Sequence, residues 1–341
     1  MTIEEFLTEW NNADTRVLVH TSGSTGKPKP LWVEKSRMLN SAHITCDFLR
    51  LKAGDTALLC MPLDYIAGKM VVVRSIERNL RLIKVKPSGH PLSDDSLRQA
   101  NALHEEITFA AMVPLQVYNS LQVPQERERL RKIRQLIIGG GAIDDNLSEA
   151  LKDFPHAVWS TYGMTETLSH IALRRLNGDS ASDWYEPFDS VEVSLNTDGC
   201  LIINAPAVCP KPLVTNDRAE LQTISLSNGK HKQVRFRILG RRDNVIDSGG
   251  IKIQIEEVER ALKAHLTMEY AITSIRDEKF GELVVLLTTD EDTNAVRAIC
   301  QRILPKYWQP RLILHTANIP QTATGKLARA EIKALATMLC Q

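Results

Sequence analysis

The sequence predicts an α/β fold: a large N-terminal part of layered helices and strands, then a β-rich stretch, then a small α+β tail. Short apolar runs, continuous at 55–63 and 107–114 and alternating in β-branched residues at 15–22, are spaced by amphipathic stretches such as 144–154, which is typical of parallel strands joined by crossover helices. Each run ends at proline or at a cluster of glycine and serine, residues that interrupt strands. The runs lie at 15–22, 55–63, 107–114 and 134–141.

The pattern changes after about residue 185. Turn signals come at short intervals in 191–206 and 232–240, which predicts antiparallel β structure. The tail then returns to mixed structure, and we place the domain boundary between Arg242 and Asp243. This gives an N-terminal domain, 1–242, and a small C-terminal domain, 243–341. In the tail we expect helices at 255–265 and 294–304 and a strand at 282–289.

The composition is that of an ordinary globular protein, and its 341 residues are enough for two packed units. The 42 basic and 41 acidic residues balance to a net charge of +1, which gives no support for nucleic acid or a membrane surface as a partner. No run approaches the roughly 18 apolar residues of a membrane helix, and the acidic N-terminus does not resemble a signal peptide. The six cysteines form no CxxC pair, so we expect reduced thiols in a cytoplasmic protein.

The sharpest motif is a loop rich in glycine and hydroxyl groups, directly after the strand expected at 15–22. Glycines allow close backbone approach, hydroxyl and N–H groups donate, and the lysine neutralises charge, so the loop suits phosphate oxygens. It differs from the common phosphate loop, because two residues separate the glycines instead of four and Pro28 follows the lysine. A flexible surface turn is the alternative. The loop contains Thr21, Ser22, Gly23, Ser24, Thr25, Gly26 and Lys27.

A second motif, STYGMTET, covers 160–167. A carboxylate at the end of a glycine-containing loop can hold Mg²⁺, which prefers oxygen ligands, so Glu166 is a candidate. Tyr162 offers a flat face for a purine. Taken alone, Glu166 is equally a solvated or helix-capping acid.

Three further motifs each have two interpretations. Gly139, Gly140 and Gly141 end an apolar strand, where they leave room for a ligand at the edge of an open sheet or make a tight turn. The segments LGRRDNVIDSGG, 239–250, and TATGK, 322–326, are candidates for motifs that carry chemistry. The alternative for the first is a charged linker, and the alternative for the second is a helix cap with a solvated lysine.

Together these motifs resemble those of the adenylate-forming superfamily of acyl- and aryl-CoA synthetases, luciferases and nonribosomal-peptide adenylation domains. The resemblance covers nearly the whole chain, from about Thr15 to Ala334, and its motifs occur in the family's order: TSGSTGKPK, YGMTET, TND, LGRRDNVIDSGG and TATGK. It implies a small, mobile C-terminal α+β domain behind the larger N-terminal domain.

The resemblance also implies the roles of individual residues. The loop from Thr21 to Lys27 wraps the β- and γ-phosphates of ATP, and Thr165 and Glu166 serve the α-phosphate and Mg²⁺. Asp217 and Arg241 hold the ribose hydroxyls, and Lys326 bridges the substrate carboxylate and the α-phosphate. Asp243 is the hinge about which the C-terminal domain turns between the two half-reactions. The adenine is lined by Gly139, Gly140, Gly141, Ser160, Thr161, Tyr162 and Gly163, and the face presented to CoA by Ser248, Gly249 and Gly250.

The chain departs from the family in three places. About sixteen residues stand where relatives carry a long segment before the phosphate loop, so we expect exposed apolar surface that favours a homodimer. The family's Thr-Gly-Asp is Thr215-Asn216-Asp217 here. Where many members place a histidine after Pro-Leu, this chain has Asp64-Tyr65, which argues against recognition of an aromatic acid by histidine.

The expected function is that of an ATP-dependent acid–CoA ligase using ATP, Mg²⁺ and CoA, through an acyl-adenylate. The Ser-Gly-Gly beyond the hinge is similar to that of o-succinylbenzoate–CoA ligases of menaquinone biosynthesis, which makes o-succinylbenzoate the expected acid. Tyr65, Lys69 and Arg74 are then candidates for the acid pocket, although the two cations are equally surface charges. The alternatives are another acyl- or aryl-CoA ligase, an enzyme that loads a carrier protein, or an adenylate-binding protein without turnover, against which Glu166 and Lys326 argue.

Overall fold

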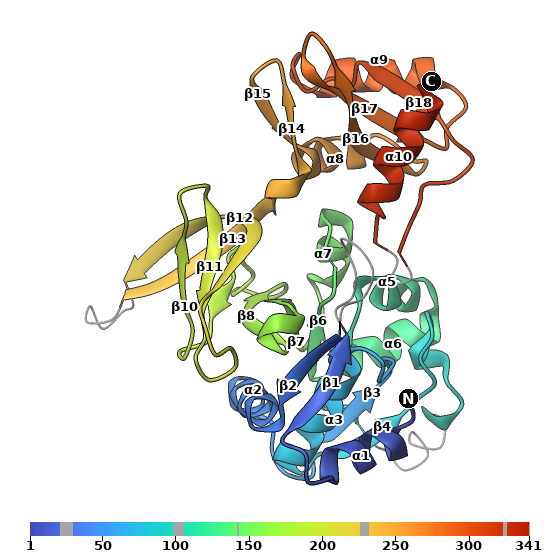
Figure 1. The fold of residues 1–341 in the computed structure, drawn as a ribbon. Helices are drawn as coiled ribbons and strands as arrows, with labels where there is room; N and C mark the ends of the chain where they lie inside the picture. The colour runs from blue at the N-terminus through green and yellow to red at the C-terminus, as the bar shows by residue number, and fades with distance from the viewer. Residues whose placement is uncertain (21–29, 98–105, 142, 226–231, 323–325, 341) are drawn as a thin grey trace.

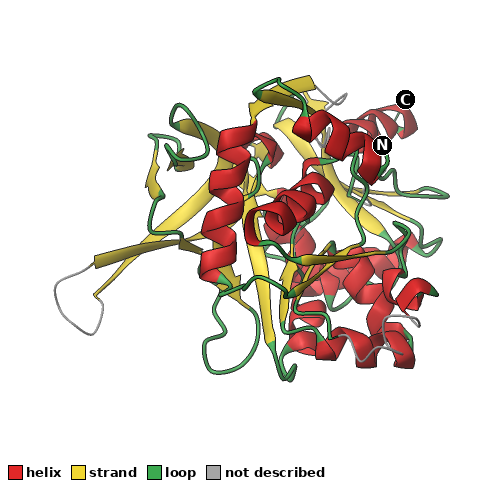
Figure 2. Ribbon diagram, turned by 90° about the horizontal axis from the view of Figure 1, so that it is seen from below, coloured by secondary structure: helices red, strands yellow, loops and turns green. Residues whose placement is uncertain are grey.

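The computed structural model describes residues 1–20, 30–97, 106–141, 143–225, 232–322 and 326–340. Its largest sheet has the strand order β4–β3–β5–β6–β7–β8–β9, parallel from β4 to β7 and antiparallel beyond (Figures 1 and 2). All residues of β3 and β5 are buried, as their unbroken apolar runs predict. The strands are β3 (Thr56–Leu59), β4 (Arg81–Lys84), β5 (Phe109–Met112), β6 (Gln135–Ile138), β7 (Ala157–Gly163), β8 (His170–Arg175) and β9 (Glu186–Pro187).

One expected strand lies outside this sheet. β1 (Arg16–His20) pairs antiparallel with β2 (Pro30–Glu34), so the expectation of a parallel strand at 15–22 is wrong in its pairing. The physical reason is visible in the burial of alternate residues. Val17 and Val19 are fully buried while their neighbours are more exposed, the pattern of a strand with one covered face. The parallel strands expected at 55–63, 107–114 and 134–141 are confirmed.

Helices connect the strands of the large sheet, and their ends follow from local chemistry. The Asp144 side chain accepts a hydrogen bond from the N–H of Leu147 and so caps α7, where the sequence predicted a helix. Pro114 lies in the first turn of α5, a position that needs no N–H donor. The connecting helices are α3 (Ile66–Arg78), α5 (Pro114–Gln122), α6 (Pro124–Lys132) and α7 (Asp145–Leu151), with a 3₁₀ turn η1 (Pro91–Ser93), whereas α1 (Ile3–Asn11) and α2 (Lys35–Phe48) lie before and after the β1–β2 pair.

The β-rich stretch forms an antiparallel sheet in the order β10–β11–β12–β13, which confirms the prediction from its turn signals. In Figure 1 this sheet stands beside the large one and leads into the C-terminal part. Its strands are β10 (Glu192–Leu195), β11 (Cys200–Asn204), β12 (Leu213–Ser225) and β13 (Lys232–Arg241), and η3 (Arg242–Asn244) follows as a single 3₁₀ turn.

The remaining elements build a separate sheet in which β14, β15, β16 and β17 are antiparallel neighbours and β18 lies parallel to β17. The hydrophobic core of the first part extends from Phe6 to Phe236, and the two apolar clusters of the last part begin at Ala271 and Ile246. The domain boundary expected between Arg242 and Asp243 falls between the last residue of the first core and the first residue of the C-terminal clusters, and it stays a prediction. The elements are β14 (Val245–Ser248), β15 (Ile251–Gln254), α8 (Ile255–Lys263), β16 (Tyr270–Asp277), β17 (Gly281–Thr288), α9 (Thr293–Ile303), β18 (Leu312–His315) and α10 (Arg329–Leu339).

Among the helices that the structure describes, none has the length and apolar character needed to cross a membrane. All six cysteines are unpaired, and only Cys340 is exposed. Burial raises the pKa of the Cys46 and Cys60 thiols to about 12, so these two are unreactive core residues.

Candidate active site

Three side chains from three strands meet where the large sheet adjoins the β-rich sheet. Tyr162, near the end of β7, donates its hydroxyl to Oδ2 of Asp217 at 2.6 Å. Asp217 faces Arg241 across β12 and β13, and their charged groups are 3.7 Å apart. Burial, followed by the charge of Asp217, raises the pKa of Tyr162, so its hydroxyl stays a donor. The structure thus brings together the residues expected at the adenine and the ribose.

Asp243 lies next to this group, in the 3₁₀ turn η3. Its Oδ2 accepts hydrogen bonds from Arg241 at 2.8 Å and from Nδ2 of Asn216 at 3.2 Å. Burial opposes the charge of Arg241, but the bond to Asp243 and the nearby carboxylates outweigh it and raise the guanidinium pKa. The asparagine that replaces the family's glycine therefore has a specific contact with the expected hinge, which the sequence did not indicate.

Lys326 reaches the same region from the C-terminal part. Burial first, and then the charge of Arg241, lowers the pKa of its ammonium. Its backbone is held by Thr322, whose hydroxyl accepts from the Lys326 N–H at 3.2 Å and whose N–H donates to the Lys326 carbonyl at 2.7 Å. In the part of the chain that the structure describes, no carboxylate pairs with the Lys326 ammonium. A half-buried cation of this kind favours an anionic ligand.

The loop after β7 is rigidly built. A Cβ on Gly163 would lie 2.2 Å from the carbonyl oxygen of Ser169, so glycine is required for this close approach. The hydroxyl of the buried Thr167 donates to the carbonyls of Met164 and Ser169 and accepts from the Met164 N–H. Leu168 then takes a positive φ of 66°. These contacts fix the 3₁₀ turn η2 (Thr165–Thr167) and the carboxylate that it carries.

Within η2, Thr165 is buried and Glu166 is exposed. Among the described residues, Glu166 has no ion-pair partner, so its carboxylate is available for a cation. No group of three or more His, Cys, Asp or Glu side chains suited to a metal occurs in the described ranges. A Mg²⁺ ion at Glu166 would therefore take its other ligands from water and substrate phosphates, as this ion commonly does.

The glycines after β6 lie between neighbouring strand ends. A Cβ on Gly139 would meet Oγ1 of Thr161 at 2.4 Å, and Gly140 has a φ of 79°. Ser160, on the same strand as Thr161, shares a 2.8 Å hydrogen bond with the Tyr185 hydroxyl. The close approach of Gly139 to Thr161 leaves no room for a side chain, in agreement with a site at the carboxyl ends of the strands.

The expected phosphate loop, Thr21 to Lys27, lies outside the described residues. The residues on either side of it are described: His20 and Pro30 are partners in the β1–β2 register, and His20 also forms a parallel bridge with Tyr65. His20, the last described residue before the loop, therefore lies next to Tyr65, one of the candidates for the acid pocket.

Of the acid-pocket candidates, Lys69 is paired within the protein. Its ammonium donates to the carbonyl of Leu18 at 2.7 Å and lies 3.7 Å from the Glu9 carboxylate. Burial lowers its pKa, and Glu9 opposes that effect. With its donors directed at β1 and α1, Lys69 has a structural role, and it is not the surface charge considered as an alternative.

Arg74 is also buried, but it has a different environment. Its guanidinium donates to Oγ of Ser169 at 2.7 Å, and no carboxylate among the described residues pairs with it. The buried Nε has no hydrogen-bond partner, and burial lowers the pKa of Arg74 to about 10. His170, buried beside it, shares hydrogen bonds with Thr45 and Ser169. The sequence did not indicate this polar cluster of Thr45, Arg74, Ser169 and His170, because its members are far apart along the chain.

Ser248, Gly249 and Gly250 lie at the turn between β14 and β15, which projects away from the large sheet in Figure 1. Gly249 and Gly250 have φ values of 61° and 82°, and Ser248 pairs with Ile251, the geometry of a two-residue hairpin turn. The turn itself therefore requires these glycines, whatever passes near them. The structure does not bring them to the Tyr162–Asp217–Arg241 group.

Comparison with known proteins shows which family the chain resembles. Residues 4–199 match the family model described as AMP-binding enzyme. A 2-succinylbenzoate–CoA ligase of Bacillus cereus is 24% identical over 350 residues, which cover 96% of this chain and 71% of that protein. A crystal structure of an acyl-CoA synthetase (AMP-forming)/AMP-acid ligase II-like protein from Dyadobacter fermentans is 29% identical with a TM-score of 0.62, and covers 96% of this chain and 91% of that one.

The o-succinylbenzoate coenzyme A synthetase of Bacillus subtilis has the same fold. Its complex with ATP and magnesium ion is 24% identical, with a TM-score of 0.73 over 92% of this chain and 69% of that one. Its complex with the acyl-adenylate intermediate OSB-AMP has a TM-score of 0.74. The chain belongs to the AMP-binding enzyme family. This membership confirms the expected α/β fold and the expected class of AMP-forming acid–CoA ligases.

Proposed function

We propose that the chain joins a carboxylic acid to ATP, forming an acyl-adenylate and pyrophosphate, and then passes the acyl group to the thiol of CoA with release of AMP. The position of Lys326 carries this proposal. This lysine comes from the C-terminal part and lies close enough to Arg241 for the guanidinium charge to lower its pKa, and Arg241 in turn faces the carboxylate of Asp217 that Tyr162 also holds.

The charges fit the first half-reaction. A carboxylate and a triphosphate repel each other, and negative charge grows on the phosphoryl oxygens as pyrophosphate leaves, so positioned cations supply most of the catalysis. A lysine about 4 Å from such charge is worth roughly 4 kcal/mol at an effective dielectric near 20. We assign this role to Lys326, the ribose hydroxyls to Asp217 and Arg241, and the Mg²⁺ that offsets phosphate charge to Glu166. The loop from Thr21 to Lys27 would hold the outer phosphates.

For the acid we propose o-succinylbenzoate, with Arg74 as the group that recognises its second carboxylate. The curated relatives are named for this substrate, and Arg74 is a buried cation without a carboxylate partner in the described residues. A charged hydrogen bond from such a group is worth about 1.5–3 kcal/mol. The unpaired thiols suit a reducing compartment, which favours the cytoplasm.

Acid-dependent pyrophosphate exchange tests the proposal. The purified protein is given ATP, Mg²⁺ and a panel of acids that includes o-succinylbenzoate and its monocarboxylate analogue, and acyl-CoA is then measured after CoA is added. We expect o-succinylbenzoate to give the fastest exchange and a CoA thioester. Exchange without a thioester would indicate a carrier protein as the acceptor, and no exchange with any acid would contradict the proposal. Arg74→Gln should reduce kcat/KM about 10- to 100-fold more for the dicarboxylate than for the analogue, with Lys69→Gln as the control.

A further inference from the structure

Helix α8 contacts the N-terminal part of the molecule at both of its ends. At its start, Nε2 of Gln254 donates to the carbonyl of Arg241 in the N-terminal part at 2.8 Å, and within the C-terminal part Nδ2 of Asn244 donates to Glu256 at 2.5 Å. Gly240, with a φ of 151°, lies so close to this pair that a Cβ would meet the Gln254 side-chain nitrogen at 2.5 Å. The first turn of α8 is thus packed on the strand that leads into the hinge.

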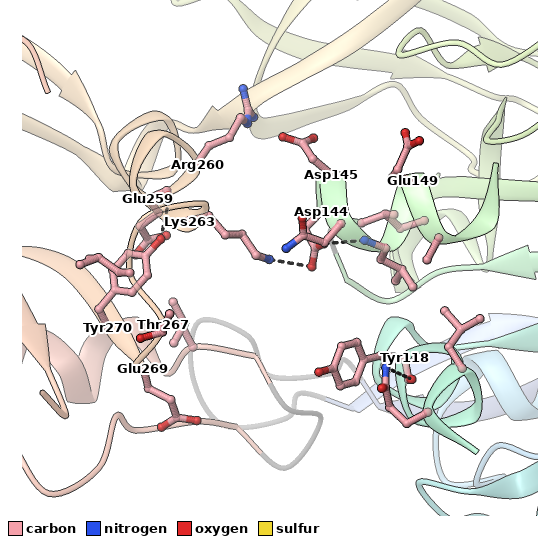
Figure 3. A pocket seen from close by; sticks show the side chains of 18 of the residues that line it. Tyr118, Asp144, Asp145, Glu149, Glu259, Arg260, Lys263, Thr267, Glu269 and Tyr270 are labelled. Atoms are coloured by element: carbon pink, nitrogen blue, oxygen red, sulfur yellow. Dashed lines mark hydrogen bonds and ion pairs between the residues drawn. The ribbon is translucent and has the colours of Figure 1, made fainter. Parts of the chain in front are cut away.

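At its end, α8 forms an ion pair with the other side of the interface. Nζ of Lys263 lies 2.6 Å from Oδ2 of Asp144, the residue that caps α7 with its other carboxylate oxygen (Figure 3). Burial opposes ionisation of Asp144, but the hydrogen bond and charge of Lys263 and the backbone N–H donors of α7 together outweigh it and lower the carboxyl pKa. Lys263 is seven residues beyond Glu256, which is about 10 Å along a helix, so α8 spans the interface between its two contacts.

The surroundings of this ion pair are open. A cleft of about 1210 Å³ separates the two parts of the molecule here, and its lining includes Tyr118 and Ile143 on one side and Met268 and Leu327 on the other. Figure 3 shows Lys263 and Asp144 reaching toward each other across this cleft. The lining also includes Arg329, close in sequence to Lys326. Lys263 and Asp144 therefore join the two walls at some distance from the hinge.

We propose that Lys263 is a positioning residue of the adenylation step. Its ion pair with Asp144 holds the C-terminal part in the arrangement that places Lys326 beside Arg241, and the pair breaks before the thiol step. This inference rests on the proposed two-step function. The two side chains are 48% and 36% exposed, so the pair is weak enough to open in each catalytic cycle. An ion pair of this exposure shifts the equilibrium between the two arrangements of the C-terminal part by about two- to fivefold.

Separate assays of the two half-reactions test the proposal. Lys263→Gln should slow single-turnover pyrophosphate release from ATP and o-succinylbenzoate about two- to fivefold, and leave thioester formation from preformed acyl-adenylate unchanged or faster. Asp144→Asn keeps an acceptor for the helix cap and should give the same shift. The double variant should slow pyrophosphate release no more than either single variant does. Lys263→Arg should restore the wild-type ratio of the rates of the two half-reactions. Lys152→Gln, which removes an ion pair within α7 and its C-cap, is the matched control. Equal effects on both half-reactions, or additive effects of the two variants, would overturn the proposal.

A distance measurement reads the same contact without any activity. Cys340 is the exposed cysteine of the described chain, and Glu149 on α7 is exposed, so spin labels at Cys340 and at Glu149→Cys report on the two parts. We expect Lys263→Glu to broaden the distance distribution, and added Asp144→Asn to reverse much of that change because it removes the repulsion. A distribution that is the same in wild type and Lys263→Glu would overturn the proposal. If no acid supports pyrophosphate release, the proposed function fails while this result still decides whether the contact holds the two parts together.

Discussion

The hydroxyl of Tyr162 lies 2.6 Å from Oδ2 of Asp217, and this bond ties the end of β7 to the first residues of β12. The two residues are 55 positions apart and belong to different sheets. Asp217 is held on its other side by Arg241. The ribose-binding carboxylate that we propose is therefore preorganised by a residue of the expected adenine site.

Removing this hydroxyl should weaken ATP binding. In Tyr162→Phe the ring stays, but Asp217 loses a donor, and hydrogen bonds to charged groups are worth about 1.5–3 kcal/mol. We expect the Kd for ATP to rise roughly 10- to 100-fold in calorimetric titration. Tyr185→Phe, which removes only a neutral bond to Ser160, is the control and should have a smaller effect. An unchanged Kd in Tyr162→Phe would separate Asp217 from nucleotide binding.

A methyl group at Gly139 should disturb the strand ends. The added Cβ would meet Oγ1 of Thr161 at 2.4 Å, whereas the nearest atom to a Cβ at Gly141 is 3.3 Å away in Pro114. Overpacking of this kind costs about 1–3 kcal/mol. We expect urea denaturation to show a larger loss of stability for Gly139→Ala than for Gly141→Ala. Adding Thr161→Ala to Gly139→Ala should recover part of it, and no recovery would show that the contact is not the cause.

Buried His170 should make stability depend on pH. Burial, and then the charge of Arg74, lowers its pKa well below 6.5, so the folded protein keeps it neutral while the unfolded chain binds a proton near pH 6.5. The unfolded state then holds more protons at acidic pH. The stabilising contribution is present above about pH 6.5 and is lost as the pH falls, by up to roughly 1.4 kcal/mol per pH unit. His170→Gln should flatten the free energy of unfolding between pH 6.5 and 5, and His265→Gln, which removes an exposed imidazole, should not.

Proline at the expected hinge should separate the two half-reactions. Proline fixes φ near −65°, so Asp243→Pro restricts the rotation that the thiol step needs. We expect single-turnover pyrophosphate release to survive and acyl-CoA production to fall at least 10-fold. Asp243→Ala removes the contacts with Arg241 and Asn216 without fixing φ, and serves as the control. If both half-reactions fall equally in Asp243→Pro but not in Asp243→Ala, the hinge lies elsewhere.

Much of the fold could be predicted from the sequence because its signals are local. The unbroken apolar runs of β3 and β5 indicate strands covered on both faces, and the capping residue Asp144 marks the start of α7. The pairing of β1 was not predictable in this way. Its alternating burial is a property of tertiary packing, and its partner β2 lies beyond a glycine-rich loop.

The site was predictable only where family motifs carry it. Tyr162, Asp217, Arg241 and Lys326 come from separate motifs, and the structure places them in one region. The hydrogen bond from Arg74 to Ser169 and the Lys263–Asp144 ion pair depend on side chains that are distant along the chain, and no local pattern marks them. Gly249 and Gly250 were predicted from a family motif, but a plain hairpin turn is enough to account for both glycines.

The most direct test of the central claim follows the acyl-adenylate itself. Wild-type protein and Lys326→Ala are mixed with ATP, Mg²⁺ and o-succinylbenzoate without CoA, quenched within one turnover, and analysed by mass spectrometry for the acyl-adenylate. We expect wild type to accumulate the adenylate and convert it to a CoA thioester when CoA is added. Lys326→Ala should bind ATP normally but form the adenylate on the order of 10²–10³ times more slowly, because the lysine acts as charge develops. Adenylate formation at the wild-type rate in Lys326→Ala would contradict the role assigned to this lysine.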